Sequence, residues 1–73
     1  METLQILGER LRLLRKERNL RQADVAQELE MTDVHYRRIE AGKINIPTLT
    51  LNFFADFYGV TTDYLLGRSE ERT

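Results

Sequence analysis

The stretch over residues 21–40 constrains this chain most, because its apolar residues fit two short helices joined by a tight turn. Three residues of its first half share one narrow face of a helix: Val25, Ala26 and Leu29. Thr32 can then accept a hydrogen bond from an early amide of a second helix, which buries Tyr36 and Ile39. The sequence therefore predicts a pair of helices in which the second presents most of its surface outward.

This pair has two interpretations that periodicity alone does not separate. It is similar to a helix-turn-helix, in which the second helix enters the major groove of DNA. It also fits an ordinary helical hairpin within a small bundle. The small Ala26 lets another backbone approach the first helix in either case.

Length and composition limit the fold to one soluble domain with a modest core. The chain has 73 residues, of which 41% are hydrophobic and 32% charged, so it is too apolar to be disordered. It has no cysteine, which excludes disulfides and thiolate metal sites. No apolar run approaches the roughly 20 residues of a membrane span, and the start, METLQILGER, lacks the features of a signal peptide. We expect a cytoplasmic protein.

The charge distribution is more informative than the net charge of −1. Residues 1–46 hold nine Lys and Arg against eight Asp and Glu, whereas residues 47–73 hold two against four. The C-terminal acids could lie on a face away from nucleic acid. A mixed, solvated helical surface explains the same counts.

Three further helices follow from the apolar spacing. We expect helices over residues 3–18, 22–29, 33–41, 48–58 and 62–66, and no strand. The first buries Leu4, Leu7, Leu11 and Leu14; the fourth buries Leu51, Phe54, Ala55 and Tyr58; the last closes the core with Tyr64 and Leu65. Asn19 and Glu30 are expected at positive φ in the turns that they occupy. Residues 68–73 are expected to form a frayed, polar tail.

Three segments carry a resemblance to the phage repressor/Cro-type (Xre-type) helix-turn-helix regulators of bacteria and phages. They are LGERLRLLRKERNLRQADVAQEL (7–29), MTDVHYRRIEAGK (31–43) and ADFYGVTTDYLLG (55–67). The resemblance implies an all-α, five-helix, lambda-repressor-like DNA-binding domain over residues 1–67, followed by the tail 68–73. The sequence departs from the family pattern at Arg21, Glu30 and Ala41.

The resemblance also implies that the first residues of the second helix of this motif face base edges. The candidates are Asp33, Val34, His35 and Arg38. Arg38 could donate to guanine, Asp33 could accept from cytosine, and Val34 could pack on a thymine methyl group. Asp33 is equally explained by the helix dipole, and His35 by simple exposure to solvent.

Other positions are expected to hold the phosphate backbone or the scaffold. By resemblance, Gln22 positions the backbone with its main-chain amide aimed at a phosphate. Lys43 and Asn45 are further candidates for phosphate contacts, and Arg37 points toward a phosphate or water. By resemblance, Arg15 and Glu40 pair across the first and third helices; both being solvated is the alternative.

A homodimer on a palindromic operator is expected, because one reading helix contacts about half of a site. The apolar residues available for the interface are Ile44, Ile46, Phe53, Phe57 and Leu66, with Phe53 expected to be the more exposed aromatic. The alternative is that each of these residues is exposed singly, which would not indicate an interface.

An enzyme is not expected. The chain has one His, no Cys, no Gly-rich phosphate loop and no evident pair of carboxylates at a cleft. No cofactor, metal or small-molecule ligand is implied. The competing function is a protein-binding module that keeps the fold without reading DNA, which the near-zero net charge and the Phe53/Phe57 stripe favour.

Overall fold

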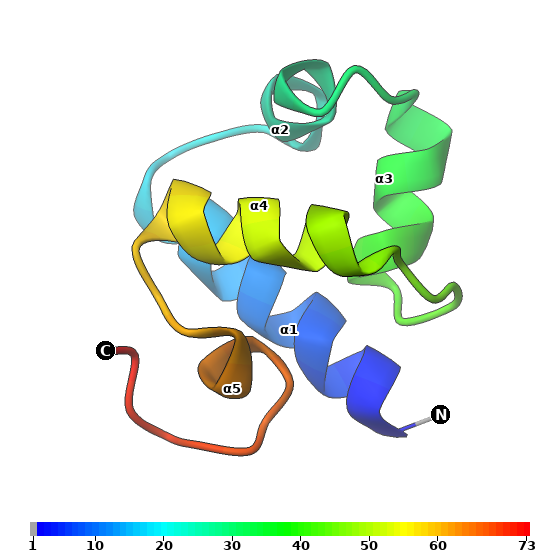
Figure 1. Ribbon diagram of the computed structural model, residues 1–73. Coiled ribbons are helices and arrows are strands. Elements are labelled where there is room, and N and C mark those ends of the chain that lie inside the picture. The colour runs from blue at the N-terminus through cyan, green and yellow to red at the C-terminus, as the bar shows by residue number, and fades with distance from the viewer. Residues whose placement is uncertain (1) are drawn as a thin grey trace.

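The computed structural model describes residues 2–73, which form five α-helices and no strand. The helices are α1 (Glu2–Glu17), α2 (Gln22–Glu28), α3 (Asp33–Glu40), α4 (Thr48–Tyr58) and α5 (Thr62–Leu65). Figure 1 shows α2 and α3 joined by a short turn, α4 crossing in front of α1, and α5 beside α1. The predicted all-helical class is confirmed, and every helix boundary lies within one residue of the expected one.

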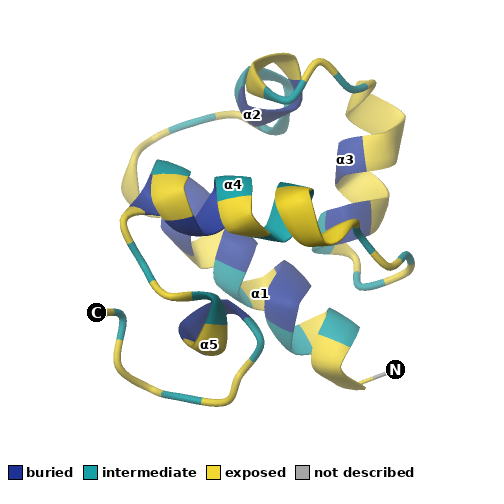
Figure 2. Ribbon diagram, viewed as in Figure 1, coloured by how far each residue is buried: buried dark blue, intermediate teal, exposed yellow. Residues whose placement is uncertain are grey.

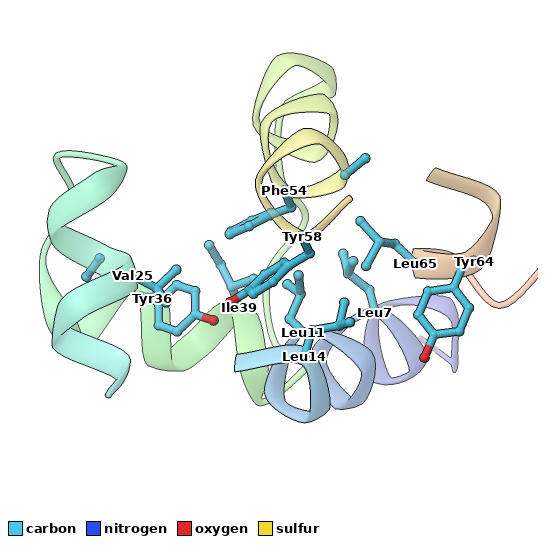
Figure 3. Close-up of a cluster of buried hydrophobic side chains, with 12 residues drawn as sticks. Leu7, Leu11, Leu14, Val25, Tyr36, Ile39, Phe54, Tyr58, Tyr64 and Leu65 are labelled. Atoms are coloured by element: carbon cyan, nitrogen blue, oxygen red, sulfur yellow. The ribbon is translucent and has the colours of Figure 1, made fainter. Parts of the chain in front are cut away.

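All five helices contribute to one core (Figure 3). Its buried side chains are Leu7, Leu11, Leu14, Val25, Ala26, Tyr36, Ile39, Phe54, Ala55, Tyr58, Tyr64 and Leu65. Burying a leucine- or phenylalanine-sized side chain contributes about 1.5–3 kcal/mol, so these residues supply most of the driving force. Three residues predicted for the core are only half-buried at its margin: Leu4, Leu29 and Leu51. Each lies in the first turn of its helix or at a helix end, where fewer neighbours surround it.

Gly8 lets α1 contact the end of α3 backbone to backbone. A Cβ atom built at this position would overlap the carbonyl group of Glu40. Any side chain at Gly8 would therefore push α3 away from α1. This contact is not among those predicted from the sequence.

The turns on either side of α2 use the two residues expected at positive φ. Asn19 has φ 58° and Glu30 has φ 54°, which confirms both predictions. After each turn an amide returns to the preceding helix, with Met31 N donating to the Ala26 carbonyl at 3.0 Å. Arg21 does not cap α2 with its own side chain; instead its amide donates to the carboxylate of Asp24 at 2.8 Å.

The expectation of a frayed tail is wrong. Arg72 donates two hydrogen bonds of 2.8 Å to the carboxylate of Glu17, and its carbonyl accepts from the amide of Thr61 at 2.9 Å. The hydrogen bond from Arg72 lowers the pKa of Glu17. Arg10 also donates to the carbonyl of Ser69 at 2.7 Å. The tail thus folds back onto α1 and α5, because the polar residues on these helices offer partners that sequence spacing does not reveal.

Candidate nucleic-acid interface

The start of α3 is formed by a side-chain cap. The Oγ1 atom of Thr32 accepts a hydrogen bond of 3.1 Å from the amide of His35, as the sequence predicted. Tyr36 and Ile39 anchor the helix with exposed fractions of 0% and 1%. Figure 2 shows most of the remaining surface of α3 exposed. The helix is therefore held from one side only and is accessible along the other.

The candidate base readers do not all share one face of α3. All four are exposed, and Val34 is 57% exposed although it is apolar. At about 100° per residue, Val34 points directly away from the buried side and forms the outermost ridge of α3, with Arg37 and Arg38 about 50° to either side of it. Asp33 lies on the same flank as Glu40, whereas His35 lies on the other flank. The outermost surface of the helix thus combines an apolar side chain with two guanidinium groups.

Arg15 and Glu40 form an ion pair that ties α1 to the end of α3. Arg15 Nε donates to Glu40 at 2.7 Å and its Nη2 at 3.0 Å, while its Nη1 donates to the carbonyl of Leu20 at 2.9 Å. Gln22 Nε2 donates to the same carboxylate at 3.2 Å. The exposed fractions of the two charged side chains are 10% and 5%. Three helices therefore meet at one carboxylate.

Burial and hydrogen bonding shift the pKa values of four residues at this ion pair. Burial alone would raise the pKa of Glu40, but hydrogen bonds from Arg15 and Gln22 are among the contacts that outweigh it, and the pKa is lowered. The hydrogen bond to Glu40 raises the pKa of Arg15. Burial raises the pKa of the neighbouring Tyr58 to about 12 and also raises that of Tyr36. Both phenols therefore stay neutral at neutral pH. Within residues 2–73, Arg15 and Glu40 are the only buried charged side chains.

The candidate phosphate contacts lie in different surroundings. The side chain of Gln22 is engaged by Glu40 and half-buried, so its main-chain amide in the first turn of α2 is the group left to contact a phosphate. Arg37 and Lys43 are exposed. Asn45 is exposed too, but its Oδ1 atom accepts from the amide of Ile46 at 3.0 Å, which orients it within its own turn.

The distribution of ion pairs explains how a chain of net charge −1 can present a positive face. Five of the eleven Lys and Arg residues pair with carboxylates in the described part of the chain: Arg10, Arg15, Arg21, Arg68 and Arg72. Arg18 donates instead to the carbonyl of Phe57 at 2.8 Å. The remaining five form no ion pair within residues 2–73 and are all exposed: Arg12, Lys16, Arg37, Arg38 and Lys43. They lie on the second half of α1, on α3 and just after it.

The apolar residues considered for a dimer interface are all half-buried: Ile44, Ile46, Phe53, Phe57 and Leu66. Phe53 and Phe57 stack with their ring centroids 5.6 Å apart, and Phe53 also meets the core residue Phe54 edge-on. The most exposed large apolar side chain of residues 2–73 is Leu49, at 81%. Leu49 is not among the residues predicted from the sequence for an interface, because it lies off the apolar stripe of α4 that Leu51, Phe54 and Tyr58 form.

The fold, with an exposed second helix on a short turn, defines a helix-turn-helix domain. A family model described as a helix-turn-helix domain matches residues 6–66, and the chain belongs to this family. No curated protein matches the chain. The family match suggests DNA binding, and members of the family are typically not enzymes.

Residues 2–73 contain no group of three or more His, Cys, Asp or Glu residues that could hold a metal ion. None of the described helices is long and apolar enough to cross a membrane.

Proposed function

We propose that this protein binds double-stranded DNA sequence-specifically as a small transcriptional repressor of the phage repressor/Cro (Xre) type. The observation that carries the proposal is the concentration of exposed cations without ion pairs on and beside α3, a helix anchored from one side only. Such cations neutralise phosphates, while the exposed ridge of the helix enters the major groove. A regulator of this kind acts in the cytoplasm, where bacterial and phage DNA is found.

In this proposal the first turns of α3 read bases. Arg38 donates to the O6 and N7 atoms of guanine, and Val34, beside it on the outermost surface of the helix, packs on a thymine methyl group. Asp33 accepts from the amino group of a cytosine. His35, on the other flank, contacts a base or phosphate at the edge of the groove.

Phosphate contacts fix the position of the domain on the duplex. Gln22 contributes its main-chain amide, and Arg37, Lys43 and Asn45 contribute side chains. The ion pair of Arg15 with Glu40 holds α3 against α1, so the reading helix keeps one orientation.

The protein acts as a homodimer on a palindromic operator. Ile44, Ile46, Phe53, Phe57 and Leu66 supply the interface, and their partial burial leaves apolar surface that a second copy can cover. Two copies related by a two-fold axis place their α3 helices in successive major grooves, roughly 34 Å apart.

A gel-shift titration tests the proposal. Random and genomic duplexes are titrated at low and moderate salt. Binding should persist on a subset of genomic fragments at moderate salt, while binding to random duplex is lost. Equal weak binding to all fragments, or none, would contradict sequence-specific recognition.

A protein-binding module is the second candidate function. Leu49, at 81% exposed, and Val34, at 57%, offer apolar surface, and the net charge of −1 does not attract polyanions from a distance. The same titration separates the two functions, because a module of this kind would leave every duplex unshifted at low salt.

A further inference from the structure

An open hollow lies where α1, α2 and α3 meet. It is lined by Arg12, Arg15, Lys16, Gln22, Arg37, Glu40 and Ala41. Arg15, Gln22 and Glu40 are hydrogen-bonded to one another and form its fixed part. Arg12, Lys16 and Arg37 are exposed and are free of ion pairs within residues 2–73. Three available cations from two helices that are distant in sequence therefore surround one place on the surface.

The charge of this hollow is strongly positive against a protein of net charge −1. Four cations line it with a single carboxylate, that of Glu40, which already accepts two hydrogen bonds from Arg15. Glu9 lies one turn before Arg12 on α1 and lines a neighbouring hollow with it, but the two form no ion pair within residues 2–73. Glu17, next to Lys16 in sequence, is paired with Arg72. The acids of α1 therefore leave the cations of the hollow available to a ligand.

We propose that this hollow holds a DNA phosphate beside the C-terminal half of α3, and that Arg12 and Lys16 hold it together with Arg37. The inference rests on the proposed DNA binding and extends the contact surface from the reading helix onto α1. A guanidinium offers a planar fork of donors to phosphate oxygens, and the ammonium group of Lys16 adds a point charge. Arg37 stands on the flank of α3 toward the hollow, so it joins the new site to the groove contacts of its own helix.

The role of Arg12 and Lys16 differs from that of Arg15. Arg15 is buried and is committed to Glu40, so its loss would disturb the fold. Arg12 and Lys16 are exposed, and glutamine at either position leaves the core untouched. Variants at these two positions therefore report on phosphate contact rather than on stability, and equal melting temperatures verify this.

The test combines phosphate-ethylation interference with a salt titration on a duplex that the wild-type protein binds. The double variant Arg12→Gln/Lys16→Gln is compared with the wild type and with Arg68→Gln. Arg68 is an exposed cation after α5, outside the hollow, with only a distant carboxylate at 3.9 Å. It serves as the control for a loss of positive charge alone.

We expect ethylation of one phosphate per half-site to weaken binding of the wild type and no longer to affect the double variant. The slope of log affinity against log salt should become shallower by about 0.9, the value of one lost phosphate contact. Arg68→Gln should keep both the wild-type pattern and the wild-type slope.

Other outcomes overturn the inference in distinguishable ways. A double variant with the wild-type slope and pattern, or one matched by Arg68→Gln, refutes the hollow as a phosphate site and leaves the proposed function intact. A wild-type protein that binds no duplex at any salt concentration refutes the proposed function itself, before any variant is compared.

Discussion

Replacing Glu40 by alanine should destabilise the domain more than replacing any exposed residue of α3. The carboxylate accepts hydrogen bonds of 2.7 and 3.0 Å from Arg15 and one of 3.2 Å from Gln22. Its removal leaves the guanidinium of Arg15, which is 10% exposed, with only the carbonyl of Leu20 as partner. Breaking a buried ion pair in this way costs about 3–5 kcal/mol.

This loss is large for a domain of 73 residues. Small domains shift their melting temperature by about 4–8 °C for each kcal/mol, so a drop of at least about 12 °C is expected. Thermal unfolding followed by far-ultraviolet circular dichroism measures it. Glu28→Ala is the matched control, because Glu28 is an exposed carboxylate on α2 that forms no ion pair in the described chain. It should stay within about 0.5 kcal/mol of the wild type.

The pH dependence of the effect follows from the lowered pKa of Glu40. A carboxyl group whose pKa is lower in the folded than in the unfolded state stabilises the fold above its ordinary value, here 4.5. That contribution is lost as the pH falls through the folded-state pKa. The difference in unfolding free energy between the wild type and Glu40→Gln should therefore be largest at neutral pH and shrink in acid. A Glu40→Ala variant no less stable than Glu28→Ala, or a difference that does not shrink in acid, would refute this account of α3.

Four further substitutions test the remaining claims. Arg38→Ala should cost roughly 1–3 kcal/mol on the preferred DNA site and relax specificity there; equal losses on specific and random DNA would contradict its role in base reading. Lys43→Ala should weaken binding to all sequences alike and reduce the salt slope by about one unit, and a sequence-dependent loss would argue against a phosphate contact. Glu30→Gly should stabilise the fold by up to about 1 kcal/mol in urea unfolding, because Glu30 has φ 54°. A destabilised variant would contradict this expectation. Phe53→Asp should convert a dimer to a monomer in analytical ultracentrifugation at tens of micromolar, whereas an intact dimer would place the interface elsewhere.

The helices could be predicted from the sequence because local rules determine them. The apolar spacing of α1 and α3 requires a helix, and Thr32 is suited to begin one. Asn19 and Glu30 stand where each chain reversal needs a positive φ, and both have it. The class of the fold follows from these local features taken in order.

Contacts between distant parts of the chain could not be predicted in the same way. Gly8 is needed because the carbonyl of Glu40 lies against it, and nothing near Gly8 in sequence indicates that. The tail folds back because Arg72 reaches Glu17, a partner that only the folded chain provides.

The candidate interface shows the same limit. The residue types of the interface could be predicted from the sequence, because α3 has few apolar positions and its other side chains must be exposed. Which cations remain available was not, because pairing depends on tertiary structure. Arg10 and Arg12 lie on one helix, yet only Arg10 meets a carboxylate, at 3.1 Å from Glu70. The hollow beside α3 could therefore be identified only from the folded structure.

Selection of bound sequences from a random pool of double-stranded DNA tests the central claim most directly. If α3 reads bases from a two-fold dimer, repeated selection should enrich an inverted repeat whose half-sites are centred roughly 34 Å apart, about one turn of DNA. Guanine should recur at one position of each half-site, and Arg38→Ala should lose the preference at that position. A folded protein that enriches no sequence over the starting pool would contradict the claim.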